Sequence, residues 1–522
     1  MWLTKKRVAL LGALPVAFET LVIYYPFLLS FVKRFSINTL LLVASNPLVH
    51  HAFEQSFVQA TFGTLASVAL GYPLGLVLGL VNFRASSFYR AVVFLPFLLP
   101  SIVVIVGFQE AYGFAWPFAL LTHGLSGITA INAYYNSPLI ALLVASSLER
   151  LNPELVYSAR TLGASSFEVL TKVVTPLTLS SLCVGALLTF VYSYLSFLVP
   201  LAIGGASHYT VEVEIYFFLR LGEFGQAVAL SFLQLLSLVF VVFVLIRLRG
   251  YGFSFGRLSS LRHAYRALNA RVKALVYLLL FLFLFFELYP LVSIAIHTID
   301  GCFRGFRELL EVSAQGVLQT SLQALVLNSV VFAVLSASVS LALSICATHF
   351  ALSVNKRLRF YEILMLTPLL ISPVSIGVAL YLTYYGLSAL NEVWLVIVFA
   401  QSAVSIPVAM RFLLEGLRRT PKELVFSSRV LGAGSLETLF RIEIPLSAHA
   451  ISSSTAIALA VSLGEFAATN IVYIPKFATI PIAIFSLLEI RKLAAASALS
   501  LILVALALIA YYTVFRLGTS EA

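Results

Sequence analysis

The sequence predicts an all-α, polytopic membrane protein with about twelve transmembrane helices in two repeated six-helix halves. Composition, recurrent apolar runs and an internal repeat predict this class. Apolar residues make up 61% of the 522 residues, and charged residues only 11%. Soluble proteins carry about 45–50% apolar and about 25% charged residues, so this chain could not cover its surface with polar groups. The composition excludes a soluble enzyme, a disordered chain and a secreted disulfide scaffold.

Apolar runs of spanning length recur along the chain without the period-two alternation of barrel strands. The start resembles a signal peptide, but its apolar stretch is too long and no small-residue cleavage site follows, so we interpret it as the first span. Prolines interrupt the third and fourth spans, which membrane helices tolerate when neighbours satisfy the freed carbonyl. The expected spans are 8–31, 57–81, 89–108, 132–148, 179–203, 225–246, 274–297, 325–351, 361–383, 393–414, 450–472 and 494–515.

Most lysines and arginines fall on the side of the membrane that also holds both termini, and the positive-inside rule makes this side cytoplasmic. Residues 247–273 are rich in arginine and contain no acid, which predicts a cytoplasmic linker at anionic lipid headgroups. We therefore expect permease-like halves at 1–246 and 274–522, in a multi-pass protein of the cell membrane. The net charge of +11 is spread over short connections, so lipid is an expected partner and nucleic acid is not.

One segment occurs twice without a gap, as RLNPELVYSARTLGASSFEVLTKVVTPL from Arg150 and as RTPKELVFSSRVLGAGSLETLFRIEIPL from Arg419. Both copies lie between the fourth and fifth span of their half, on the cytoplasmic side, which indicates duplication. The matching residues that we single out are Glu154 and Glu423, Leu155 and Leu424, Arg160 and Arg429, Leu162 and Leu431, Gly163 and Gly432, and Pro176 and Pro445.

Each copy predicts two short helices along the membrane surface. The first ends at Gly163, whose backbone freedom permits a turn, and Ser165 with Glu168 forms a capping box for the second. Pro176 and its counterpart Pro445 predict a break before the next span. The leucines among charges suit docking into a groove of a cytoplasmic partner. An ordinary interfacial helix is the alternative, but it would not require the same glycine, arginine and proline twice.

The repeated segments resemble the cytoplasmic loop of the membrane subunit of binding-protein-dependent ABC importers. That loop is patterned as E-A-A, three residues, glycine, nine residues, then I-x-L-P. Gly163 and Gly432 occupy the glycine position, and residues 173–176 and 442–445 the final motif. The sequence departs from the pattern at E-A-A, where residues 157–159 and 426–428 begin with an aromatic residue. Glu154 and Glu423, one helical turn earlier, are candidate substitutes for the missing glutamate.

A narrower resemblance, to fused double permeases of the ferric iron and thiamine type, rests on residues 192–216 and 462–488. It implies a type I ABC importer permease fold, two copies of a cytoplasmic ABC ATPase at the repeated loops, and an extracellular or periplasmic solute-binding protein. The chain contains no G-x-x-x-x-G-K-[ST] loop, so ATP would be bound by the partner. We therefore expect no enzyme activity and no cofactor in this chain. The binding protein would contact the loops near 204–224 and 473–493.

Glu465 is the main candidate for the substrate pathway, because an ionisable residue inside a span is costly and marks a functional site. Its neighbour Phe466 and the similar Glu223 are weaker candidates. A structural glutamate satisfied by Ser462 or Asn470 is the alternative. The cysteines and histidines have no metal-ligand spacing, so no metal site is expected.

The alternative function is a twelve-helix secondary transporter of the major facilitator type, which also has two six-span halves. Such proteins usually carry an aspartate in the turn between the second and third spans, and VNFRASSFYR has none. Iron, thiamine, other cations and oxyanions all remain open as substrates.

Overall fold

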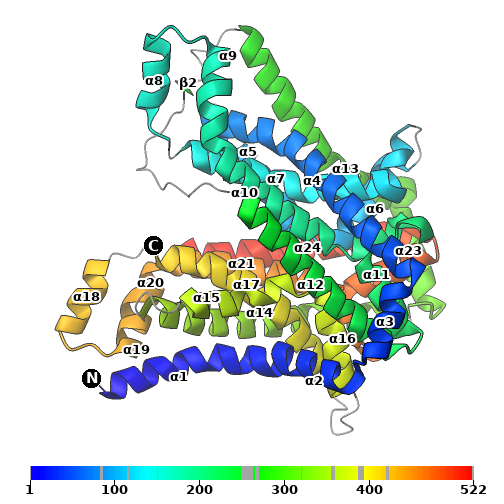
Figure 1. Cartoon of the computed structure of the whole chain (residues 1–522). Helices are drawn as coiled ribbons and strands as arrows, with labels where there is room; N and C mark the ends of the chain where they lie inside the picture. The colour runs from blue at the N-terminus through cyan, green and yellow to red at the C-terminus, as the bar shows by residue number, and fades with distance from the viewer. Residues whose placement is uncertain are drawn as a thin grey trace.

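The computed structural model describes residues 2–82, 86–113, 117–149, 151–248, 263–264, 270–318, 320–353, 359–385, 393–418 and 422–519, and these are almost entirely helical (Figure 1). The two strands, β1 (Val81–Asn82) and β2 (His263–Ala264), form one short parallel pair. The rest of the expected linker 247–273 lies largely outside the described residues.

The helices follow the expected order in both halves. In the first half they are α1 (Trp2–Glu19), α2 (Tyr25–Arg34), α3 (Ile37–Ser45), α4 (Pro47–Leu80), α5 (Ser86–Phe94), α6 (Ser101–Tyr112), α7 (Gly124–Leu148), α8 (Pro153–Thr161), α9 (Ser166–Glu168), α10 (Thr175–Tyr194), α11 (Val211–Arg220) and α12 (Phe224–Leu248). In the second half they are α13 (Ala270–Ala314), α14 (Leu322–Ser353), α15 (Arg359–Leu366), α16 (Pro373–Tyr384), α17 (Val393–Leu417), α18 (Lys422–Val430), α19 (Ser435–Thr438), α20 (Ile444–Leu446), α21 (Ala448–Gly464), α22 (Thr469–Val472), α23 (Ile480–Glu489) and α24 (Leu493–Thr519).

Among the described residues, nine helices are long and apolar enough to cross a membrane, or up to eleven when each of two bent pairs counts as one span. Each expected span except the third, 89–108, has such a candidate. There Pro96 and Pro100 remove backbone donors, and the chain forms α5, a 3₁₀ turn (Leu95–Leu98) and the short α6 instead. The fifth span ends at Tyr194, earlier than expected.

The first helix of each half packs against the other half. Helix α1 lies along α14, and Tyr361 of α15 donates a hydrogen bond from its hydroxyl to the Gly12 carbonyl, at 3.0 Å. Helix α13 packs on α6 of the first half and on α24. A Cβ at Gly107 of α6 would lie 2.9 Å from the Pro290 carbonyl of α13. The sequence halves are therefore interleaved in space.

Small residues set how closely the central helices of each half approach. In α4, Gly71, Gly75 and Gly79 face the α7 backbone, in the spacing that brings membrane helices together. The repeat places Ser340, Ser344 and Thr348 of α14 at the same positions. Here hydroxyl bonds reach α17: Ser340 Oγ lies 2.5 Å from Ser405 Oγ, and Ser344 Oγ donates to the Ile406 carbonyl at 3.3 Å.

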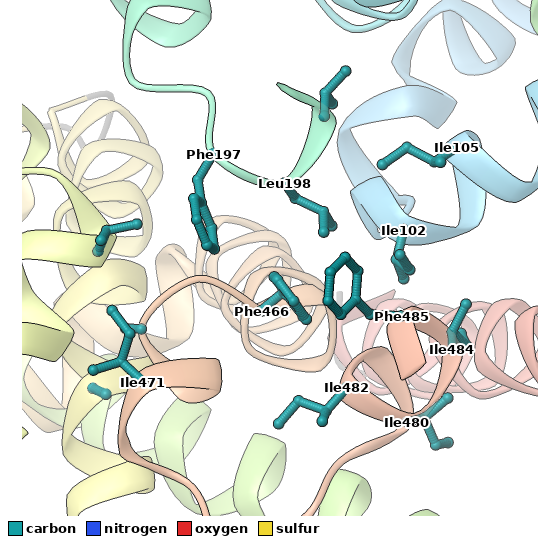
Figure 2. Close-up of a cluster of buried hydrophobic side chains, with 14 of the residues drawn as sticks. Ile102, Ile105, Phe197, Leu198, Phe466, Ile471, Ile480, Ile482, Ile484 and Phe485 are labelled. Carbon is teal, nitrogen blue, oxygen red and sulfur yellow. The ribbon is translucent and has the colours of Figure 1, made fainter. Parts of the chain in front are cut away.

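The repeated loops lie apart at one end of the molecule, where α8 and α9 are separated from α18 and α19 (Figure 1). Both chain termini lie at this same end. At the opposite end, α6, α11, α16 and α23 bring the halves together, and one buried apolar cluster extends across both (Figure 2). The two halves are thus in contact at the far end, whereas their repeated loops lie apart.

Candidate functional site

The first repeated loop begins with α8. The Asn152 side chain accepts a hydrogen bond from the Glu154 amide at 3.0 Å and caps the helix. Gly163 then adopts φ +88°, a left-handed conformation that favours glycine. Ser165 and Glu168 form the expected capping box, and Lys172 pairs with Glu168 at 3.0 Å. The turn at Gly163 and the capping box predicted for this loop are therefore confirmed, but the second helix is not a separate short helix, because it continues into α10.

The second loop repeats this geometry through α18 and α19. Gly432 has φ +93°, and Arg441 pairs with Glu437 at 3.0 Å, as Lys172 does with Glu168. The loop is braced inside by Ser428, whose hydroxyl lies 3.2 Å from that of Thr438. The side chain of Arg429 lies outside the described part.

Equivalent leucines project from both loops to the same extent. Leu155 and Leu424 are each 47% exposed, and Leu162 and Leu431 are each 88% exposed. Glu154, Glu423 and Arg160 are exposed beside them. A large apolar side chain that is almost fully exposed beside charged groups is typical of a docking surface. The glutamates and leucines singled out in both loops, and Arg160 in the first, are therefore accessible to a partner.

The break expected at Pro176 is wrong for the first half. The chain passes from α9 through a π-helical turn (Val169–Val174) into α10 as one continuous helix, with Pro176 in the first turn of α10. A proline near a helix start removes a donor that has no partner there, so it need not break the helix. In the second half, Pro445 does precede a break, a bend of 75° between Leu446 and Ala448.

A cavity of about 280 Å³ lies between the halves. Its walls combine apolar side chains with two serines and one carboxylate. They are formed by Ser101, Leu195, Ser196, Phe197, Leu198 and Val199 of the first half, and by Val404, Val461, Gly464, Glu465, Phe466 and Ala467 of the second. The cavity lies where α10 and α21 end, and both halves contribute to it, so it is the candidate pathway.

Glu465 lines this cavity and also caps α22. Its carboxylate accepts hydrogen bonds from the Ala468 amide at 2.8 Å and the Thr469 amide at 2.9 Å, and it contacts the Thr469 hydroxyl. The structural partners are therefore Ala468 and Thr469, and neither Ser462 nor Asn470 supplies them. Glu465 thus combines a structural and a pathway position. Phe466 is 3% exposed and lines the same cavity.

Glu223 does not reach the cavity. It is exposed in the turn after α11 and accepts a hydrogen bond from Gln226 at 3.1 Å, so it lies apart from this cavity and its role in the pathway stays a prediction. Its equivalence to Glu465 rested on a shared Gly-Glu-Phe triplet, which the fold places at different positions in each half. Glu212 falls within the segment near 204–224 that was expected to contact the binding protein, but it is fully buried, and Gln234 donates a hydrogen bond to it at 2.7 Å.

The sequence analysis missed the first-half counterpart of the Glu465 segment. Continued without a gap, the repeat aligns Ser196 with Glu465 and Phe197 with Phe466. Figure 2 shows Phe197 and Phe466 directed toward each other, with Phe485 of α23 beside Phe466. Extending the repeat beyond the loops would have found these residues.

Two repeated helical halves that share a central cavity and present matching loops at one end define a membrane permease. The chain belongs to the family described as binding-protein-dependent transport system inner membrane component, whose model matches residues 71–249 and 344–518. It is therefore the membrane permease of an ABC importer, a transport component and not an enzyme, and the secondary-transporter alternative is set aside.

Relatives include permeases for chemically different solutes. The thiamine transport system permease protein of Haemophilus influenzae is 25% identical over 458 residues, which cover 83% of this chain and 82% of the relative. The molybdate/tungstate permease protein of Pyrococcus furiosus is 29% identical over 34% of this chain and 69% of its own length. The spermidine/putrescine permease protein PotC of Escherichia coli K12 is 25% identical over 38% of this chain and 75% of its own. The thiamine relative therefore matches both halves, and the other two match about one half each.

Proposed function

We propose that two copies of one cytoplasmic ABC ATPase drive this permease, docked at the two repeated loops. The equal exposure of the loop leucines carries the proposal: 47% for Leu155 and Leu424, and 88% for Leu162 and Leu431. Because the two loops have the same backbone turn and the same projecting side chains, each can dock into the same groove on one of two identical partner subunits. ATP is bound by these partners, so the chain needs no cofactor of its own.

The loops transmit motion to the pathway because each continues into the helix that lines it. The first loop is joined to α10 through an uninterrupted helix, and α10 ends at the cavity residue Leu195. The second loop reaches α21, which ends beside Glu465. When the ATPase pair closes, the separated loops approach each other, and the connected helices change the opening between the halves.

The opposite face receives the solute-binding protein, through the loops near 204–224 and 473–493. This arrangement places the loops and both termini in the cytoplasm, as the distribution of lysine and arginine supports. Thiamine is the first solute to test, because the thiamine permease is a relative that matches both halves.

Native mass spectrometry of the tagged permease purified from its membrane tests this function. We expect a complex with two identical ATPase subunits, lost when Leu162→Glu and Leu431→Glu are combined. The matched control combines Leu162→Met with Leu431→Met, which keeps the apolar contact and should retain the ATPase. A chain that purifies alone and transports in response to an ion gradient would contradict the proposal.

A further inference from the structure

Two turns at the end of the molecule opposite the loops have the same backbone but opposite charges. The first outer turn, Leu219–Glu223, follows α11, and the second outer turn, Leu488–Lys492, follows α23. Their matching hydrogen bonds are Gly222 N to Leu219 O at 3.1 Å and Glu223 N to Phe218 O at 2.8 Å, and Arg491 N to Leu488 O at 3.0 Å and Lys492 N to Leu487 O at 2.8 Å. The register of the internal repeat therefore extends to both turns, and each backbone hydrogen bond of the first turn has a counterpart in the second.

Each outer turn presents an apolar side chain at its tip. Leu221 is 75% exposed and its counterpart Ile490 is 46% exposed. The left-handed position that follows is Gly222 in the first turn, at φ +80°, but Arg491 in the second, at φ +59°. A side chain in this conformation is strained by about 1–2 kcal/mol relative to glycine. Arg491 is exposed, so the second turn carries an additional positive charge beside its tip.

The charged residues that flank the tips are exchanged between the turns. Arg220 of the first turn corresponds to Glu489 of the second, and Glu223 corresponds to Lys492. All four are exposed. Neighbouring groups hold two of them in place: Arg220 Nε donates to the Tyr216 hydroxyl at 3.0 Å, and Lys492 lies 3.3 Å from Glu308.

The two turns also lie close to each other. The helices that end at these turns are joined by a series of ring contacts. Tyr216 of α11 lies 5.4 Å from Phe197, and Phe197 lies 6.0 Å from Phe466. Phe466 in turn lies 5.1 Å from Phe485 of α23. Burial raises the pKa of the Glu489 carboxyl and, in keeping with this closeness, the positive charge of Arg220 lowers it by a smaller amount. One partner molecule can therefore cover both tips at once.

The inner and outer faces thus differ in symmetry. The inner loops present the same leucines twice, as two copies of one partner require. The outer turns present the same backbone and apolar tips, but exchanging the halves reverses the charges at two matching positions, and only the second turn carries a third charge, Arg491. A single partner with two unlike lobes would meet matching charges in one orientation and opposing charges after a half-turn.

We infer that the exchanged charges of the two outer turns set the orientation of a two-lobed solute-binding protein, one lobe on each turn. Solute-binding proteins close two domains around a hinge, so they have the two unlike surfaces that this pattern would distinguish. This inference rests on the proposed docking of that protein at the outer face. Each exposed charge pair changes an equilibrium by up to about fivefold, so each of the four exchanged charges contributes up to that factor to the preference for one orientation.

Photocrosslinking in the assembled transporter, with its ATPase pair and its binding protein, tests the inference. A benzophenone label is attached at Leu221→Cys or at Ile490→Cys, in a chain whose three native cysteines are replaced. Mass spectrometry then identifies the crosslinked lobe. In the natural charge pattern, we expect the two labels to reach different lobes.

The decisive variant exchanges the four charges through Arg220→Glu, Glu223→Lys, Glu489→Arg and Lys492→Glu. The labels should then exchange lobes, whereas the control Glu54→Lys, an exposed charge in α4 outside the turns, should leave them unchanged. Unchanged lobes in the fourfold variant, or both lobes labelled equally from either turn, would overturn the inference. In those cases, stimulation of ATP hydrolysis by the binding protein would show that the proposed function still stands; its absence in the natural chain would contradict that function instead.

Discussion

Phe197 and Phe466 stack across the boundary between the two halves, with ring centroids 6.0 Å apart and ring planes inclined by 22°. Each is the repeat counterpart of the other. A second ring flanks each of them: Tyr216 lies 5.4 Å from Phe197, and its counterpart Phe485 lies 5.1 Å from Phe466. This aromatic chain joins the cavity to α11 and α23, so we expect the central pair to separate when the proposed pathway opens at this end of the molecule.

Removing the central pair should therefore make the permease leak. An aromatic pair contributes about 0.5–1.5 kcal/mol beyond its buried area, so we expect Phe197→Ala with Phe466→Ala to raise ATP-independent efflux by up to about tenfold. Efflux of radiolabelled thiamine from proteoliposomes without ATP measures this. The control is Phe240→Ala, which removes an exposed ring of α12. Equal efflux from both variants would show that the stack does not close the pathway.

Replacing both loop glycines should uncouple ATP hydrolysis from transport. Gly163 and Gly432 have φ +88° and +93°, where a β-branched residue is strained by about 1–2 kcal/mol. Neither site has an atom within 4 Å of an added Cβ, so strain is the main effect and steric overlap is not. We expect Gly163→Val with Gly432→Val to retain ATP hydrolysis in the assembled complex but to lose most transport.

The matched control is Gly434→Ala, in the same loop, with equally open space and no left-handed backbone. It should transport at nearly the normal rate. Fully coupled transport in the double valine variant would refute a role for the glycines in transmission.

The loops could be predicted from sequence because their geometry is local. A glycine specifies each turn, at Gly163 and Gly432, and the capping box of Ser165 and Glu168 adds to the first. The repeat places both glycines at the same spacing from their neighbours, so each loop supports the prediction for the other. The interleaving of α1 and α13 could not be predicted, because apolar faces fit several neighbours equally well in lipid. The position of Glu223 relative to the distant cavity could not be predicted either, because the local triplet Gly-Glu-Phe does not specify it.

Glu465→Gln should separate the structural role of this residue from its pathway role. Glutamine keeps one acceptor for the Ala468 or Thr469 amide but loses the charge, and a hydrogen bond to a charged group contributes about 1.5–3 kcal/mol. We expect a thermal midpoint lower by a few degrees and slower transport. If transport per folded molecule is unchanged while the midpoint falls, Glu465 serves only to cap α22. Thr469→Val, which removes the hydroxyl contact but keeps the charge, is the control.

Adding a methyl group at the α4–α7 contact of the first half, by Gly75→Ala, should lower the stability strongly. Removing a hydroxyl at the equivalent contact of the second half, by Ser344→Ala, should lower it less. A Cβ at Gly75 would lie 2.8 Å from the Ala141 carbonyl and 2.8 Å from Val144 Cβ, so Gly75→Ala must push the helices apart. Overpacking of this kind destabilises by about 1–3 kcal/mol. At the repeat position, Ser344→Ala removes one hydrogen bond to Ile406, which in membrane proteins averages about 0.6 kcal/mol. Thermal unfolding of both variants in the same detergent measures the difference. A Gly75→Ala variant as stable as Ser344→Ala would mean that α4 and α7 separate easily, and the glycine stripe would then not set their distance.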